Sequence, residues 1–208
     1  MATAVPVLSL KDFQRISNAI AGIIVAERGE LIGKCILFGI MGQHLLRTRY
    51  KMTDARAVVG AFWVCIAPTK VIAFAGHQGT TDNRQNFHCW VGAAGFLFDF
   101  SSFLYPVLAR QYLGAACPPL MLQKHALQVS ESRHALEKPG DFHLLEDRAL
   151  REITIDATLS VPATGDILQI LEEWYQPPPK KMDIIHVADG NGNAKPVSIH
   201  NSILRGAW

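Results

Sequence analysis

Two short apolar runs joined by a glycine-bounded tetrapeptide constrain the fold of this chain more than any other feature. Residues 87–91 and 96–100 are rich in aromatic side chains, and the four residues between them begin and end with glycine. This pattern predicts two antiparallel strands and a tight turn. Alternation puts His88 and Trp90 on one face, and the hairpin brings Asp99 alongside or diagonal to His88. We therefore expect an imidazole that a carboxylate orients.

A candidate nucleophile lies upstream, at the start of a predicted helix. Residues 33–49 carry apolar side chains at steps of three and four, which is typical of a buried helix. Cys35 falls in its first turn, where unpaired N–H groups and the helix dipole favour a thiolate. The alternative is that Cys35 is a small core residue, as we interpret Cys65 and Cys117 to be. The downstream histidine and aspartate favour catalysis at Cys35.

The remaining sequence predicts a mixture of helices and strands in a single domain over residues 1–208. We expect helices at 9–28, capped by Ser9, and at 165–175, capped by Thr164. Predicted strands cover residues 57–66, 71–75, 126–130, 142–146, 151–159, 184–187 and 196–200. The polar residues 76–86 are expected to form a loop that lines the cleft.

Composition excludes several classes of function. The formal net charge is +2 and like charges do not cluster, so we expect no nucleic-acid partner. No apolar run is long enough for a membrane span, and residues 19–26 fit an amphipathic core helix better than a signal sequence. The four cysteines are widely spaced and form no C-x-x-C pair, which indicates reduced thiols in the cytoplasm. The sequence leaves the oligomeric state open.

Five short elements resemble, in order and spacing, the transglutaminase-like branch of the papain-like cysteine enzymes, in a bacterial-type form. They are Gly33-x-Cys35, Leu45-Leu46-Arg47, Ala55-Arg56-x-Val58-x-Gly60, His88-x-Trp90-Val91 and Asp99. The resemblance covers roughly residues 30–100 and leaves the C-terminal half unassigned.

The resemblance implies an α+β fold in which N-terminal helices pack on an antiparallel β-sheet. It also implies a catalytic triad of Cys35 as nucleophile, His88 as base and later acid, and Asp99 as the residue that orients His88. The backbone N–H of Cys35 is a candidate oxyanion donor. The glutamine that precedes the cysteine in papain is missing, so the second donor is unassigned. Trp90, on the face of His88, is a candidate substrate-binding residue; no cofactor or metal is implied.

The function implied is a cysteine hydrolase or acyltransferase that acts on an amide or acyl bond through a thioester. A peptidase, an amidase and a deamidase all fit, and the substrate is a peptide, a protein or a small amide. Hydrolysis is preferred over transfer to an amine. Two alternatives remain open: a catalytically silent fold that serves as a binding or regulatory module, and an effector that deamidates a host protein.

Overall fold

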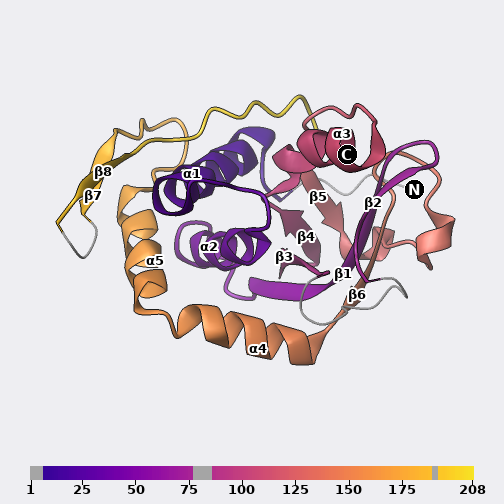
Figure 1. The fold of residues 1–208 in the computed structure, drawn as a ribbon, viewed down its shortest axis with the longest axis horizontal. Helices are drawn as coiled ribbons and strands as arrows, with labels where there is room; N and C mark the ends of the chain where they lie inside the picture. The colour runs from indigo at the N-terminus through magenta and orange to yellow at the C-terminus, as the bar shows by residue number, and fades with distance from the viewer. Residues whose placement is uncertain (1–6, 77–85, 189–191) are drawn as a thin grey trace.

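The fold is described here from a computed structural model, over residues 7–76, 86–188 and 192–208 (Figure 1). It is an α+β structure in which helices pack around a curled antiparallel sheet. In the chain order, the helices are α1 (Leu10–Arg28), α2 (Cys35–Thr48), α3 (Tyr105–Leu113), α4 (Arg148–Leu159) and α5 (Pro162–Trp174). No helix in this described part combines the length and hydropathy that crossing a membrane requires.

The two N-terminal helices form as the sequence predicts. Ser9 caps α1 by accepting a hydrogen bond from the Asp12 N–H at 3.1 Å, and Gly29 ends it in the left-handed region with φ 75°. Helix α2 begins at Cys35, so the cysteine does stand in the first turn. Both helices bury apolar faces against each other and the sheet, which confirms that residues 19–26 belong to a core helix.

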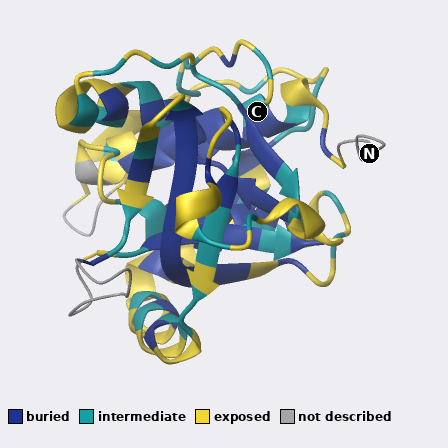
Figure 2. Cartoon of the chain, turned by 90° about the vertical axis from the view of Figure 1, so that its right-hand side faces the viewer, coloured by how far each residue is buried: buried dark blue, intermediate teal, exposed yellow. Residues whose placement is uncertain are grey.

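In the part of the chain that the structure describes, the main sheet has six antiparallel strands. They are β1 (Arg56–Ala67), β2 (Lys70–Phe74), β3 (His88–Ala93), β4 (Phe96–Asp99), β5 (Leu122–His125) and β6 (Phe142–Glu146). The strand order is β2-β1-β3-β4-β5, and β6 also pairs with β1. Ten consecutive residues of β1 are buried, so both of its faces are covered. Figure 2 shows such buried residues in dark blue along the strands in the interior.

The β3–β4 hairpin matches the prediction closely. Ala93 pairs with Phe96, which leaves a two-residue turn, and Ala94 and Gly95 have φ values of 50° and 76°. Two positive φ angles define a type I′ turn, whose twist suits a hairpin. The Asp54 carboxylate accepts a hydrogen bond from the Ala94 N–H at 2.7 Å and so holds the turn.

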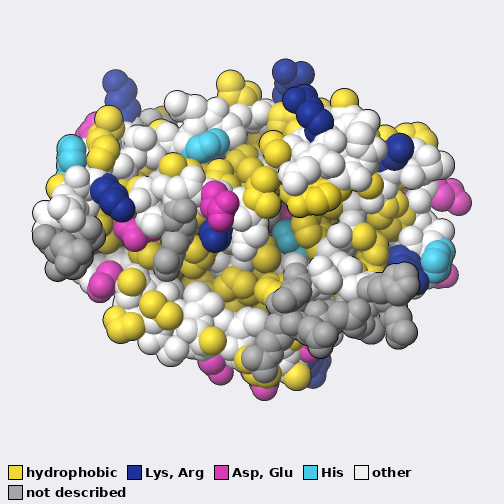
Figure 3. All heavy atoms as spheres, viewed as in Figure 1, with side chains coloured by type: hydrophobic (Ala, Val, Ile, Leu, Met, Phe, Trp, Pro, Cys, Tyr) yellow, Lys and Arg dark blue, Asp and Glu magenta, His cyan; other side chains and the backbone are white. Residues whose placement is uncertain are grey.

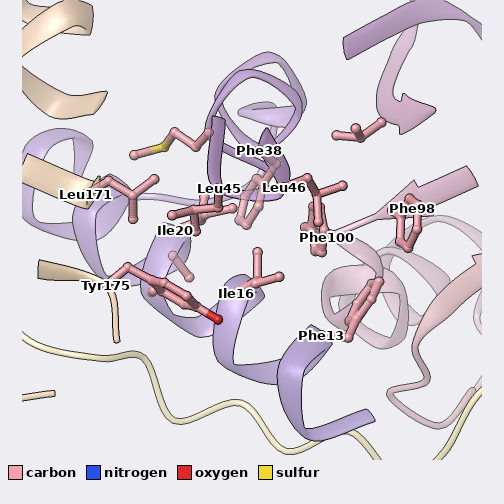
Figure 4. Packing of buried hydrophobic residues seen from close by; sticks show 14 of the residues in the cluster. Phe13, Ile16, Ile20, Phe38, Leu45, Leu46, Phe98, Phe100, Leu171 and Tyr175 are labelled. Atoms are coloured by element: carbon pink, nitrogen blue, oxygen red, sulfur yellow. The ribbon is translucent and has the colours of Figure 1, made fainter. Parts of the chain in front are cut away.

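The core ties the N- and C-terminal halves of the chain together. One cluster contains buried residues from Leu8 to Leu204, including side chains of α1, α2 and α5 (Figure 4). A second cluster, on the opposite face of β3, joins Trp90 and Phe62 to α3. The final segment runs beside α1 and then pairs with Met121 through a parallel bridge at Ala207 (Figure 1). The C-terminal half therefore completes the sheet and the core.

Several expectations for the C-terminal half need correction. Residues 151–159 are not a strand but part of α4, and residues 126–130 are not a strand, because β5 ends at His125. Asp147 caps α4 by accepting from the Leu150 N–H at 2.9 Å, which outweighs the β-branched residues that imitate a strand. The His125 ring accepts from the Leu127 N–H at 3.2 Å and turns the chain out of the sheet.

Other boundaries differ less. Helix α5 begins at Pro162, whose fixed φ suits a first helical position, and Thr164 is not its cap, since its hydroxyl donates to the Thr158 carbonyl. Strand 142–146 is confirmed as β6. The predicted tail strands form the hairpin of β7 (Ile185–Ala188) and β8 (Ala194–Val197). Most of the predicted loop 76–86 lies outside the described residues.

Close packing of α2 on the sheet gives a test of this fold. A Cβ atom on Gly42 would lie 2.4 Å from the Phe100 ring, whereas one on Gly165 of α5 would meet nothing within 4 Å. Alanine has the higher helix propensity at both positions. We expect Gly42→Ala to lower the free energy of unfolding by about 1–3 kcal/mol, because the buried ring must move.

The matched control is Gly165→Ala, which should raise the free energy of unfolding by about 0.5–1 kcal/mol. Urea unfolding followed by circular dichroism measures both. Equal stabilisation by the two substitutions would contradict this packing of α2.

Candidate active site

Helix α2 places Cys35 beside the first residue of β3. A Cβ on Gly39 would lie 2.2 Å from the Cys89 sulfur, and one on Gly42 would lie 3.3 Å from a Val91 methyl. These two contacts show that α2 runs along β3 in the same direction. Cys35 stands one helical turn before Gly39 and so reaches the point where β3 begins, at His88.

His88 and Asp99 form a buried pair across the hairpin. His88 Nε2 and Asp99 Oδ2 are 2.8 Å apart, and the two residues are only 2% and 1% exposed. Val91 pairs with Phe98, so Asp99 lies diagonal to His88 on the same face. The structure thus brings together the histidine and aspartate that the sequence singles out.

Two further residues hold the Asp99 carboxylate, and sequence reasoning missed both. Oδ1 accepts hydrogen bonds from the Ser101 N–H at 2.9 Å and the Ser101 hydroxyl at 2.6 Å. The Tyr105 hydroxyl donates to Oδ2 at 2.5 Å. The Asp-x-Ser spacing is a local signal that could have indicated Ser101. Tyr105 comes from α3, and only the tertiary fold brings it to Asp99.

Aromatic rings enclose the imidazole. The Phe74 ring stacks on His88 with centroids 4.2 Å apart and planes at 19°, and Phe62 lies at 5.4 Å. Phe74 ends β2, so the strand pairing of β1 and β2 delivers it to the site. These contacts fix the plane of the ring and keep water from the His88–Asp99 hydrogen bond.

Electrostatics favour a charged His88–Asp99 pair. Burial by itself lowers the pKa of His88, but the Asp99 carboxylate and its hydrogen bond, assisted by Cys35, raise it to about 10. Burial raises the pKa of Asp99, but the charge of His88 and the hydrogen bonds from His88, Ser101 and Tyr105 lower it overall. Burial and Asp99 raise the pKa of Tyr105, so its hydroxyl remains a donor. His88 therefore carries a proton at neutral pH.

The second ring nitrogen of His88, Nδ1, is the one that Asp99 does not bind. Nδ1 is buried and forms no hydrogen bond within the described part of the chain. The Cys35 thiol is close enough to help raise the pKa of His88, and Nδ1 is the nitrogen that Asp99 leaves available to it. The thiol therefore lies next to the imidazole, on the side of Nδ1.

Cys35 and His88 line a common cavity of about 270 Å³. Its described walls come from residues 31–35, the end of β2, the start of β3 and helix α3. On the face shown in Figure 3, hydrophobic side chains gather over the region where Figure 1 places these elements. Cys35 is partly exposed, whereas His88 is buried.

The other cysteines have different surroundings. Burial raises the pKa of Cys65, Cys89 and Cys117, which disfavours their thiolates. Cys89 packs against Gly39 on the face opposite His88, as strand alternation indicates. Trp90 shares the face of His88 but is 4% exposed, packs on Phe62 and is not among the described residues that line the cavity. The structure does not place it where it would touch a substrate.

The start of α2 provides a backbone hydrogen-bond donor next to the Cys35 sulfur. The Cys35 N–H lies in the first turn of α2, where a helix provides no internal acceptor. Among the described side chains that line the cavity, Lys34 and Tyr112 also carry hydrogen-bond donors. Within that part of the chain, no three His, Cys, Asp or Glu side chains cluster closely enough to hold a metal ion.

The fold and the site together define an α+β protein with a cysteine at a helix start beside a buried histidine–aspartate pair. The chain belongs to the family described as "Protein of unknown function (DUF2026)", whose model matches residues 9–208. It is similar over its full length to a solved chain described as "The crystal structure of genomics APC5867". The TM-score is 0.86 with 24% identity and complete coverage of both chains, so the two share a fold. No curated protein matches the chain.

The His88–Asp99 pair predicts a specific pH dependence of stability. A raised pKa in the folded state means that the contribution of His88 is complete below its ordinary pKa of about 6.5 and declines as pH rises towards 10. In Asp99→Asn, the carboxylate that raises the pKa of His88 is removed, while burial still lowers it. We therefore expect the stability advantage of the wild type over Asp99→Asn to be greatest near pH 6 and to shrink steadily by pH 9.

Urea unfolding of both proteins at several pH values measures this difference, and other titrating groups cancel between them. A difference that is constant from pH 6 to 9 would show that His88 is not held protonated by Asp99.

Proposed function

We propose that the protein is a cysteine-dependent hydrolase or acyltransferase that acts on an amide or acyl bond through a thioester. One observation carries the proposal. The Asp99 carboxylate binds His88 Nε2 in the protein interior, while Nδ1 has no hydrogen-bond partner among the described residues and lies on the side available to Cys35. A structural histidine would have both nitrogens satisfied, whereas an acid–base catalyst needs one nitrogen for the reaction.

The first half-reaction follows from these positions. The Cys35 thiolate attacks the acyl carbonyl carbon, a C–S bond forms, and the carbonyl oxygen becomes an oxyanion. The Cys35 N–H donates a hydrogen bond to that oxyanion. The C–N or C–O bond to the leaving group then breaks, and protonated His88 gives its proton to the departing amine or alkoxide. The product is a thioester on Cys35 and a neutral imidazole.

The second half-reaction restores the enzyme. Neutral His88 accepts a proton from water or an amine as its oxygen or nitrogen attacks the thioester carbonyl. The C–S bond breaks, Cys35 leaves as the thiolate, and His88 again holds the proton. Asp99 stabilises the imidazolium in both halves, and Tyr105 and Ser101 hold Asp99 in place.

The arrangement also supports a relationship to the transglutaminase-like branch of the papain-like enzymes. A helix carries the nucleophile, and an antiparallel hairpin carries the histidine and the aspartate, in the order implied by the resemblance. Four unpaired thiols suit a reducing compartment such as the cytoplasm. Hydrolysis is proposed ahead of transfer, because water needs no second binding site.

An acetylation experiment tests this function. After brief exposure to p-nitrophenyl acetate and an acid quench, mass spectrometry should find one acetyl group on Cys35. Cys35→Ala should abolish p-nitrophenol release, and Asp99→Asn should slow it by about 10²-fold or more, because the base is no longer oriented.

Cys117→Ala is the matched control and should retain full activity. Acetyl groups on lysines alone, with equal turnover in Cys35→Ala, would contradict the proposal and favour a catalytically silent binding fold.

A further inference from the structure

The walls of the cavity next to Cys35 are apolar on several sides. Leu31 and Ile32 come from the segment before α2, Phe87 from the residue before β3, and Leu104 and Leu108 from the start and middle of the α3 region. Three separate parts of the chain thus direct hydrophobic side chains into one space. Hydrophobic side chains therefore form most of the described cavity wall.

The polar groups of the cavity are few. Besides Cys35 and His88, the polar side chains of the described lining are those of Ser101, whose hydroxyl already donates to Asp99, of Lys34, and of Tyr112 through its hydroxyl. Lys34 is partly exposed and lies 3.6 Å from Glu30. No carboxylate or carboxamide side chain lines the cavity in the described part of the chain. Away from Cys35, the described side chains therefore offer a polar substrate chain few hydrogen bonds to replace those it makes with water.

Hydrophobic groups of the cavity wall also reach the solvent. The Tyr112 ring and the Ile32 side chain line the cavity and belong to residues that are 68% and 39% exposed. Exposed apolar side chains at the rim of an apolar cavity indicate that a hydrophobic ligand covers them in use.

The size of the cavity limits the ligand. An apolar protein cavity of about 150 Å³ holds a benzene ring, and this one measures about 270 Å³. It has room for an aromatic ring with several methylene groups, or for an aliphatic chain of similar volume.

We propose that the site takes an apolar acyl group, a medium-length aliphatic or arylalkyl carboxylic acid derivative, in preference to the polar side-chain amide of glutamine. This inference rests on the proposed function and specifies its substrate class. The acyl carbon leaves its oxygen or nitrogen and bonds to Cys35 Sγ, and His88 gives its proton to the leaving group. Water then releases the acid and regenerates the thiol. The acyl chain lies between residues 31–32 and α3 throughout.

A series of p-nitrophenyl esters from acetate to dodecanoate, with phenylpropionate, tests the proposal. We expect kcat/KM to rise by about fourfold per methylene while the chain fills the cavity and to fall once the chain exceeds it. A blocked glutamine dipeptide should release no ammonia at a comparable rate. A flat dependence on chain length, or a preference for the glutamine dipeptide, would overturn the inference.

Substitutions of one residue in the cavity wall test whether that wall sets the preferred chain length. Leu108→Ala should move the optimum to longer chains, and Leu108→Phe should move it to shorter ones, because the residue lines the cavity. Val107→Ala is the matched control, since Val107 is the neighbouring residue on α3, is 49% exposed and does not line this cavity. If Leu108 variants fail to fold, Leu31→Ala probes the opposite wall.

Different results would contradict the proposed function and the proposed acyl specificity. If no ester of any length acylates Cys35, the proposed function itself fails. If all esters acylate Cys35 at similar rates, or if the optimum is the same in both Leu108 variants, the function stands and the apolar acyl specificity is wrong.

Discussion

The buried hydrogen-bonded pair of His88 and Asp99 is the interaction on which the rest of the site depends. Removing two charges from water costs several kcal/mol for each, and a single hydrogen bond does not recover that cost. Asp99 accepts three further hydrogen bonds from Ser101 and Tyr105, so all the surrounding donors favour the ionised carboxylate. Three elements serve this arrangement: the hairpin provides the diagonal register, α3 provides Tyr105, and β2 provides the Phe74 ring over His88.

A second constraint is the close approach of α2 to β3. Gly39 and Gly42 have no side chains, so the helix lies directly on the Cys89 and Val91 side of the strand. This contact fixes the position of Cys35 one helical turn earlier, next to the residue at which β3 begins. Cys35 is consequently open to a cavity, while His88 is buried. A larger residue at either glycine would move the two functional groups relative to each other.

Much of the N-terminal half is predictable because its signals are local. Apolar periodicity indicates α1 and α2, and alternation with a glycine-bounded turn indicates β3 and β4; together they place Cys35, His88 and Asp99. The rest depends on contacts between distant segments. Tyr105 and Phe74 reach the site only through the tertiary fold, and α4 overrides its β-branched residues through the Asp147 cap and the burial of Leu150 and Ile155. For Trp90, strand alternation correctly predicts the face of β3 on which the ring lies. It cannot show that the ring packs on Phe62 and is buried.

The most direct test of the central claim is the rate of iodoacetamide modification at each cysteine between pH 5 and 9, in the wild type and in His88→Gln. Glutamine can still donate to Asp99 but cannot hold a proton. Cys117 is half-buried and serves as the internal reference. In the wild type, Cys35 should react on the order of tenfold faster than Cys117 near pH 6, because the His88 imidazole lies beside the Cys35 sulfur while burial raises the pKa of Cys117, and His88→Gln should remove that advantage. If Cys35 reacts no faster than Cys117, or if its rate is unchanged in His88→Gln, then the histidine does not activate the cysteine and the catalytic account is wrong.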